Sequence, residues 1–470
     1  MASALQSLVL ALTAVTAASI FLPLPAQRLL EEREPPPPVW PYAMYKSSFT
    51  EIVPPRNLSA HLAFTWHHPE GRFGTVLAGG PVIDGEGNFY LSGHDNFRKL
   101  NSMGEQQWEF RPPSQTNNMP VLGSSAVLGN DVGGHAFALD METGWPLWVT
   151  EVSQGSGGDS GYPAVHKGLF VMATEPGHTN TQDGGNVRIV ALNETTGDLV
   201  WNLRVSIPVW NFQPLFTADD HFLAMDFTGS MMKVRLDSGE LVWHTPAPGS
   251  AQSFSDGGAV MGDENVYTCS NPGLSTGSEG EMGIVRALSI ADGSIVWEKL
   301  LPQPCNSYPA FGPINGKMAV VVTPGSFPGA PVMHGSLMAL DAATGDELWR
   351  FQAPPFSNIE GLARGDVEGY DVRAASKDPY VLPICAPAHW GAPIITGDGT
   401  VYAIRMDGLL YAVRAPTVSE APATGIDFHS SSGVEVETFD ALGCALHGSF
   451  AFAPGTMALQ TCDSLWVFKF

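Results

Sequence analysis

A short alternation of apolar and polar positions recurs along the chain and predicts a series of β-strands. In its clearest copy, residues 339–349, an apolar strand leads into a turn at Thr344 and Gly345, and a second strand follows with Trp349. Alternation over four to eight residues is typical of half-buried strands. The Gly supplies a positive φ that other residues resist. The segment therefore predicts two antiparallel strands joined by a tight turn.

The Gly-x-x-x-Trp spacing of this segment occurs six times, each time after an apolar strand. The steps between consecutive copies are 40, 53, 42, 54 and 52 residues. A repeat of this length that contains several short strands is typical of propeller blades, and the Trp offers a flat face for packing between blades. The predicted docking pairs are Gly104/Trp108, Gly144/Trp148, Gly197/Trp201, Gly239/Trp243, Gly293/Trp297 and Gly345/Trp349.

Two further units without the Trp complete the predicted ring. Residues 392–439 predict a seventh blade, and residues 450–470 predict three strands of an eighth. Residues 58–66 supply the missing outer strand if they pair with residues 465–468, which closes the ring and removes exposed sheet edges. We therefore predict an all-β, eight-bladed propeller of four-stranded antiparallel blades over residues 57–470, with seven blades as the alternative.

The N-terminus predicts the compartment. Residues 5–26 carry no charge, and small residues such as Ala18 and Ala26 offer cleavage sites. This pattern is typical of a secretory signal peptide over residues 1–26; an uncleaved anchor is the alternative, because the apolar run approaches the ~20 residues of a spanning helix. A Pro-rich linker is expected at residues 27–56. We expect a protein of the secretory pathway, extracellular or lumenal, or periplasmic if the source is bacterial.

The charge of the chain limits the classes of partner that it could bind. The 47 acidic and 23 basic residues give a net charge of −24 without any basic cluster, which argues against nucleic-acid binding. We expect a monomer that binds a protein or a small molecule. Sequons at Asn57 and Asn193 predict glycans if the source is eukaryotic.

The five cysteines favour disulfides in an oxidising compartment. Cys444 and Cys462 belong to one neighbourhood, and Cys305 could pair with Cys269 or Cys385. The sequence does not decide the connectivity. The alternative is that several of these residues are buried thiols.

The repeats resemble those of the quinoprotein (pyrroloquinoline-quinone, PQQ-type) propeller family. Ala339, Asp341, Thr344, Gly345 and Trp349 stand at the positions of that family's docking repeat. The segment from Ala138 to Trp148 matches equally well, and the segment from Ala191 to Trp201 matches with an amide in place of the acid. The resemblance covers roughly residues 57–470 and implies the propeller fold. The family includes quinone dehydrogenases and non-catalytic propellers such as a bacterial outer-membrane assembly scaffold.

Chain length varies on one predicted face of the ring. Residues 174–186, 268–283 and 323–335 are insertions between second and third strands, and residues 353–388 form the longest connection to a following inner strand. All of these emerge opposite the Gly turns. Insertions gathered on one face of a repeat array mark its binding face. We expect the function on this face.

The candidate site residues lie where inner strands begin. Asp159 and Asp256 are candidate catalytic carboxylates, and Asn211, Asn306, His389 and Trp390 are candidate cofactor-binding residues. A carboxylate and an amide at this opening could hold Ca²⁺ beside PQQ. The alternative is that these groups cap turns and strand ends.

Other patterns weigh against metal and quinone chemistry. The chain has no adjacent Cys pair and no Cys-x-x-Cys-His haem site. Residues 366–371 look superficially like a calcium loop but lack the ligand spacing of an EF-hand, so a solvated acidic loop is expected. His178, His334 and His447 are dispersed, without metal-chelating spacing. The sequence thus leaves two hypotheses, a non-catalytic binding module and a PQQ- and calcium-dependent alcohol or sugar dehydrogenase.

Overall fold

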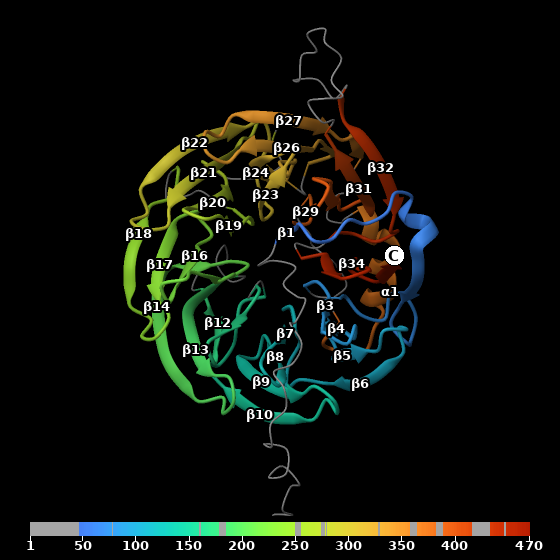
Figure 1. The fold of residues 1–470 in the computed structure, drawn as a ribbon. Helices are drawn as coiled ribbons and strands as arrows, with labels where there is room; N and C mark the ends of the chain where they lie inside the picture. Colours follow the sequence, from blue (N-terminus) through green and yellow to red (C-terminus); the bar gives the residue numbers. More distant parts are fainter. Residues whose placement is uncertain are drawn as a thin grey trace, which may run out of the picture. The chain divides into compact units, whose positions relative to one another are not determined.

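Eight four-stranded sheets follow one another around a ring (Figure 1). The computed structural model describes residues 47–77, 79–158, 161–177, 185–249, 255–273, 278, 280–327, 330–357, 364–381, 389–415, 433–445 and 448–470. All of them belong to one compact unit that begins at Pro37. The predicted eight-bladed, all-β propeller is confirmed.

The first four blades each run from the axis outward in chain order. Blade 1 comprises β3 (Val82–Ile83), β4 (Phe89–Ser92), β5 (Phe97–Leu100) and β6 (Gln106–Phe110). Blade 2 comprises β7 (Val121–Leu122), β8 (Ala126–Asn130), β9 (His135–Asp140) and β10 (Pro146–Glu151). Blade 3 comprises β11 (Ala164–His166), β12 (Leu169–Pro176), β13 (Asn186–Asn193) and β14 (Leu199–Val209). Blade 4 comprises β15 (Leu215–Phe216), β16 (His221–Met225), β17 (Met231–Arg235) and β18 (Leu241–Thr245).

The remaining blades follow the same order, with two additions. Blade 5 comprises β19 (Ala259–Met261), β20 (Asn265–Ser270), β21 (Gly283–Ser289) and β22 (Ile295–Leu301). Blade 6 comprises β23 (Ala310–Ile314), β24 (Lys317–Val322), β26 (Ser336–Asp341) and β27 (Glu347–Gln352), and a separate ribbon pairs β25 (Val332–Met333) with β28 (Phe356–Ser357). Blade 7 comprises β29 (Ile394–Thr396), β30 (Val401–Ile404), β31 (Leu409–Arg414) and β32 (Glu435–Asp440). Blade 8 contains β33 (Phe450–Ala453), β34 (Thr456–Gln460) and β35 (Leu465–Lys469).

The N-terminal strand β2 (Leu62–Trp66) closes the ring as the outer strand of blade 8. It pairs antiparallel with β35, so that Trp66 lies opposite Leu465. The predicted closure is confirmed, although the strand is shorter than expected. Leu58–His61 instead form the 3-10 helix η2, and at its start the backbone N–H groups of Asn57 and Leu58 donate to the Glu437 carboxylate at 3.0 and 2.8 Å.

Five of the six predicted Gly turns pack on the Trp of the preceding blade, and the first, at Gly104, packs on Phe64 of β2 instead. Gly144 has φ +71° and faces the ring of Trp108, which a Cβ would approach to 2.6 Å. The Trp108 indole N–H donates to the Met141 carbonyl in the same turn at 3.1 Å. Corresponding indole bonds run from Trp148, Trp201, Trp243 and Trp297 to Glu194, Leu236, Ile290 and Ala342. Positive φ and lack of space together require Gly, and this contact repeats the docking of one blade on the next.

A fifth strand, β1 (Ser48–Phe49), lies on the axial side of blade 7. It pairs in parallel with the inner strand β29, and the Ser47 hydroxyl accepts a hydrogen bond from the Phe311 N–H of blade 6 at 2.9 Å. Figure 1 shows β1 near the centre of the ring. Part of the stretch expected to be a linker is therefore built into the propeller. We call the face with the Gly turns the underside and the opposite face the upper face.

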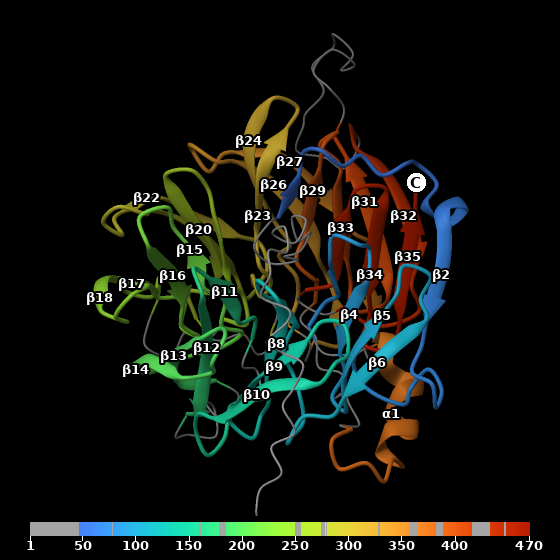
Figure 2. The same ribbon diagram turned by 60° about the horizontal axis from the view of Figure 1, so that its bottom comes forward.

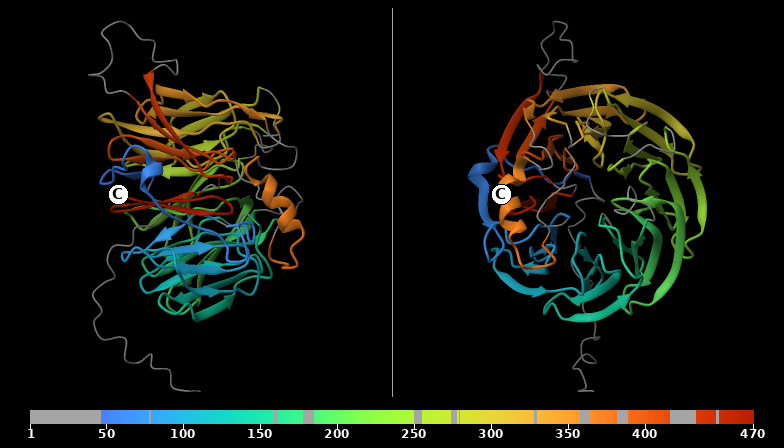
Figure 3. Two further views of the ribbon diagram at one scale, coloured as in Figure 1. Left: turned by 90° about the vertical axis from the view of Figure 1, so that its right-hand side faces the viewer. Right: turned by 180° about the vertical axis from the view of Figure 1, so that it is seen from behind.

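Residues 364–381, here called the strap, lie on the upper face. They contain the 3-10 helix η3 (Arg364–Asp366) and the helix α1 (Val367–Ala374), which lies outside the layer of blades (Figures 2 and 3). The prediction of a solvated acidic loop at residues 366–371 was wrong. Asp366 is buried and forms an ion pair with the equally buried Arg373. The Asp366 carboxylate can be buried because the Arg373 guanidinium donates a hydrogen bond to it. The two residues are seven positions apart in the strap.

Candidate functional site on the upper face

The upper face brings three of the predicted site residues together near the axis. Asn211, Asp256 and Asn306 come from three successive connections between an outer and the next inner strand. The Asn211 side-chain amide donates to the Asp256 carboxylate, and the Asp256 backbone N–H donates to the Asn306 side-chain oxygen at 3.2 Å. The structure thus links blades 3 to 6 through one chain of amide and carboxylate groups, here called the axial cluster.

A second row of residues holds the axial cluster in place. The Asn271 amide donates to the Asn306 side-chain oxygen at 2.8 Å, and the Asn271 oxygen accepts the Cys305 N–H at 2.8 Å. Cys305 is bonded to Cys269 in a disulfide, which is one of the two pairings that the sequence allowed for Cys305. The Tyr308 hydroxyl donates to the Asn211 carbonyl. Most polar groups of the cluster are therefore hydrogen-bonded to neighbouring residues, whereas the Asn306 Nδ2 atom is buried without a hydrogen-bond partner among the described residues.

A shallow pocket opens beside the axial cluster. It is lined by Trp210, Asn211, Gln213, Leu215, Ala224, Met225, Tyr308 and the small residues Gly257, Gly258 and Ala259 at the start of β19. Its volume of about 10 Å³ has room for a single water molecule. Asn211 adopts φ +46°, a left-handed conformation that Asn tolerates better than most residues, and this turns the chain at the pocket rim. The pocket that these described residues form is therefore small.

His389 and Trp390 belong to a different cluster, packed among residues of blades 6 and 7. Both are buried, and their rings stack at 5.6 Å, with the Arg405 guanidinium 5.7 Å from the Trp390 ring. Burial lowers the pKa of His389 to about 3, and the charge of Arg405 acts in the same direction. The imidazole is therefore neutral, and its Nδ1–H donates to the Ser326 carbonyl at 3.2 Å.

Several sequence candidates lie outside the described residues. These are Asp159, Cys385, His178 and His447. His334 is exposed, and its backbone N–H donates to the Ser326 hydroxyl at 3.0 Å. Asn57 and Asn193 are both described, and the Asn193 side-chain oxygen caps its own turn by accepting the N–H of Thr195 at 2.9 Å.

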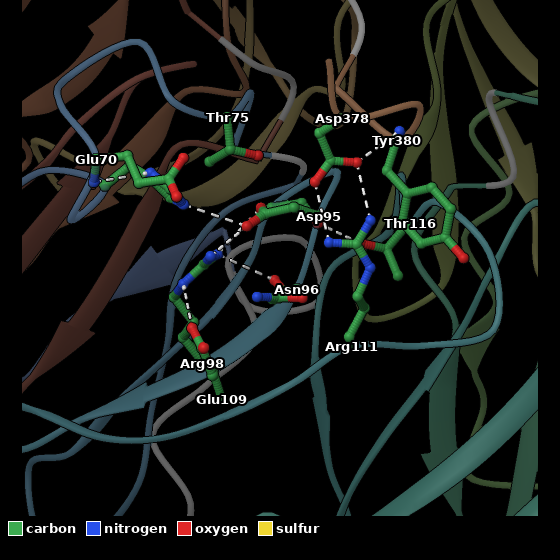
Figure 4. A network of polar contacts seen from close by, with 12 residues as sticks. Glu70, Thr75, Asp95, Asn96, Arg98, Glu109, Arg111, Thr116, Asp378 and Tyr380 are labelled. Atoms are coloured by element: carbon green, nitrogen blue, oxygen red, sulfur yellow. Dashed lines mark hydrogen bonds and ion pairs between the residues drawn. The ribbon is translucent and has the colours of Figure 1, made fainter. Parts of the chain in front are cut away.

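The far end of the strap is fastened to blade 1 (Figure 4). The Arg111 guanidinium makes two bonds to the Asp378 carboxylate at 2.8 and 2.9 Å and lies 4.3 Å from the centre of the Tyr380 ring. The Tyr380 hydroxyl donates to the Pro113 carbonyl. The hydrogen bond from Arg111 lowers the pKa of Asp378. No sequence pattern predicted this contact, because its two ends are 267 positions apart.

A buried His–Asp–Arg group lies next to this anchor (Figure 4). Asp95 accepts a bond from His68 Nε2 at 3.2 Å and forms an ion pair with Arg98. The Glu70 N–H donates to His68 Nδ1, which leaves the imidazole proton on Nε2, facing Asp95. Burial raises the pKa of Asp95, but the bonds from His68 and Arg98 outweigh it and hold that pKa well below its usual range. The group orders the upper edge of blade 1.

Comparison with known proteins agrees with this architecture. The family model described as "Outer membrane protein assembly factor BamB", a PQQ-repeat model, matches residues 63–299 and again residues 236–370. The chain belongs to this PQQ-repeat propeller family.

Proteins similar to this chain include an enzyme and assembly factors. A polyvinylalcohol dehydrogenase from Pseudomonas sp is 27% identical over 299 residues, 51% of this chain and 46% of that protein. The outer membrane protein assembly factor BamB of Moranella endobia (strain PCIT) is 22% identical, over 52% of this chain and 59% of that protein. The chain thus spans about half the length of these two relatives. The BamB of Burkholderia pseudomallei (strain K96243) is 25% identical over 355 residues, 63% of this chain and 83% of that protein.

Solved structures show the same fold. The crystal structure of BamB from Moraxella catarrhalis has a TM-score of 0.57 at 13% identity, covering 87% of this chain and 99% of that one. Quinohemoprotein alcohol dehydrogenase from Comamonas testosteroni has a TM-score of 0.58 at 15% identity, covering 92% of this chain and 80% of that one. The fold is therefore common to a BamB and a dehydrogenase.

The pocket beside the axial cluster, as the described residues form it, does not fit the quinone that a dehydrogenase of this fold would hold. The pocket at the axial cluster admits about one water, whereas a tricyclic quinone needs a slot many times larger. The Asp256 carboxylate and the Asn306 oxygen already accept hydrogen bonds from neighbouring residues. In the part of the chain that the structure describes, no three carboxylate, His or Cys side chains are grouped for a metal ion. In addition, β1 takes up space on the axial side of blades 6 and 7.

Proposed function

We propose that this propeller is a non-catalytic binding module that holds a segment of another protein on its upper face. One observation carries the proposal: Asn211, Asp256 and Asn306 are joined by hydrogen bonds beside a pocket for one water. Such a surface presents fixed side chains to a partner but has no room for a reacting substrate beside a cofactor. The similarity to several BamB proteins supports a protein partner.

The rim of the pocket suggests how a partner would be held. Trp210, which is partly exposed, supplies a large, rigid contact area, and aromatic residues of this kind are enriched where proteins bind each other. Asp256 adds a carboxylate in a chain with a net charge of −24. A partner segment that combines an apolar side chain with a basic one would complement this rim.

We place this function outside the cytoplasm. The disulfide between Cys269 and Cys305 favours an oxidising compartment. Among the described residues, no helix is long and apolar enough to cross a membrane. An extracellular or periplasmic propeller therefore remains the proposal, with residues 1–26 as the exporting or anchoring segment.

The experiment is a selection of a displayed library of random peptides on the purified full chain. We expect enriched peptides to carry apolar and basic residues, and to lose about tenfold in affinity or more when Trp210→Ala removes the aromatic rim. The matched control is Trp145→Ala, which removes an exposed Trp on the underside and should leave affinity unchanged. Equal losses in the two variants, or no enrichment, would contradict the proposal.

The rival function is a PQQ-dependent dehydrogenase, favoured by the 27% identity to a polyvinylalcohol dehydrogenase. Its test is to incubate the protein with PQQ and Ca²⁺, remove unbound quinone, and assay dye reduction with alcohols and aldoses. We expect neither quinone retention nor turnover. Retention of one quinone per chain with turnover would establish the enzyme instead.

A further inference from the structure

Cys444 and Cys462 lie side by side beneath the strap. Their Sγ atoms are 2.6 Å apart, and neither side chain is exposed. Non-bonded heavy atoms keep about 3.5–4 Å apart, whereas a covalent S–S bond is about 2.05 Å long. The backbone N–H of Cys462 also donates to the Cys444 carbonyl at 3.1 Å, which holds the two residues in register. The geometry is that of two sulfur atoms ready to bond.

The two cysteines belong to different segments of the upper face. Cys444 follows β32 in the connection between blades 7 and 8, and Cys462 lies in the turn between β34 and β35. The two segments touch closely, since a Cβ on Gly443 would come within 2.4 Å of the Thr461 side chain. A bond between the sulfurs would join the connection to the turn.

The strap begins on these two segments. A Cβ on Gly365 would meet the Gly443 carbonyl at 2.5 Å and the Cys444 N–H at 2.8 Å. The Cys462 sulfur lies 3.8 Å from the Asp366 carboxylate, which forms the buried ion pair with Arg373. A buried ion pair is stable only while its geometry is held, so the floor formed by residues 443–444 and 461–462 supports the whole start of the strap.

We propose that Cys444 and Cys462 are a redox-active pair and that their oxidation to a disulfide fastens the strap to the ring. This site is separate from the Cys269–Cys305 disulfide beside the axial cluster. It does not rest on the proposed binding function.

The chemistry is thiol–disulfide exchange with a low-molecular-weight disulfide such as oxidised glutathione. One cysteine thiolate attacks the oxidant and releases one glutathione thiol, and the second cysteine then displaces the other. Two S–H bonds are lost, one S–S bond forms, and the two electrons reduce the oxidant to two thiols. Because both sulfurs are buried, attack requires the start of the strap to lift. The reverse exchange with two thiols of reduced glutathione, which are oxidised to its disulfide, returns both cysteines to thiols and the strap to its less firmly fastened state.

The test compares the full chain after treatment with oxidised glutathione and after treatment with dithiothreitol. Remaining thiols are alkylated, peptides are mapped by mass spectrometry, and hydrogen exchange is followed over residues 364–381. We expect a peptide that links Cys444 to Cys462 in the oxidised protein. The strap amides should exchange about tenfold more slowly in that form, because a cross-link restricts local opening.

Variants separate this pair from the other cysteines. Cys444→Ala/Cys462→Ala should abolish the difference in strap exchange, whereas the matched control Cys269→Ala/Cys305→Ala should keep it. Cys385→Ala should also keep the difference in strap exchange. If either double variant fails to fold, this variant still tests whether the difference needs Cys385. A link from either residue to Cys385, alkylation of both thiols after oxidation, or equal strap exchange in both redox states would overturn the proposal.

Discussion

On the underside of the ring five of the six predicted Gly turns meet the Trp of the preceding blade in the same way, whereas on the upper face the contacts differ from blade to blade. The underside contacts join neighbouring blades, as Gly239 and Trp201 do. The upper-face contacts also join distant parts, as Asp378 and Arg111 do. The difference separates a repeated contact that builds the ring from individual contacts that shape one surface. Function is expected where the repetition ends.

Breaking the strap's ion pair should have the largest effect on the upper face. Arg373→Met leaves the Asp366 carboxylate buried without its charged partner, which costs about 3–5 kcal/mol. We expect the strap to undock, seen as a loss of hydrogen-exchange protection in α1. The double variant Asp366→Leu/Arg373→Met should recover part of the loss, because it removes both charges. Protection equal to wild type in the single variant would contradict this account of the strap.

On the underside, Gly239→Ala should destabilise the ring by about 3 kcal/mol. The new Cβ would be 2.6 Å from the Trp201 ring at a residue with φ +72°. Gly168→Ala is the matched control, since Gly168 has φ +77° but nothing within 4 Å of a Cβ. It should cost about 1 kcal/mol, for the backbone alone. Urea unfolding measures both, and equal costs would show that the Trp contact is not what requires Gly.

The buried His389 should make the free energy of unfolding depend on pH in the acid range. Its pKa is lowered from 6.5 to about 3, so between these pH values the unfolded chain binds a proton that the folded chain does not. Stability should therefore fall by about 1.4 kcal/mol per pH unit as pH drops through this range. His389→Gln should flatten that part of the curve of unfolding free energy against pH. An unchanged slope would mean that the imidazole takes up its proton inside the fold.

The smallest expected effect is at the far anchor of the strap. Arg111→Ala removes the two bonds to Asp378 and the stacking on Tyr380, but the pair is partly exposed, so the loss should stay below about 1 kcal/mol. The melting temperature should hardly move, while exchange at residues 376–381 increases. Arg111→Lys keeps the charge without the two-pronged contact and should give an intermediate result. A loss as large as that of Arg373→Met would contradict the ranking of the two anchors.

The sequence predicted the repeated part of this molecule well. The Gly turns depend on neighbours within one segment, and the pairing of β2 with β35 follows from counting the strands that each blade needs. The strap could not be predicted in this way. Its helix buries an acid that looks solvated in the sequence, and Arg373 shows no sign of its role until the fold places it against Asp366.

The candidate site was predicted only in part. Asn211, Asp256 and Asn306 stand out because each precedes an inner strand, but their mutual hydrogen bonds depend on how blades 3 to 6 converge. His389 and Trp390 also precede an inner strand, β29. They are buried in the packing of blades 6 and 7. Local pattern identifies the face of the ring, and the three-dimensional packing decides which side chains remain available on it.

Hydrogen exchange of the full chain with and without a selected peptide tests the central claim most directly. The account predicts that bound peptide protects amides of the upper face around residues 210–213 and 255–258, and leaves the Gly turns around Gly144, Gly239 and Gly293 unchanged. Protection confined to those Gly turns, with no change at the axial cluster, would contradict it.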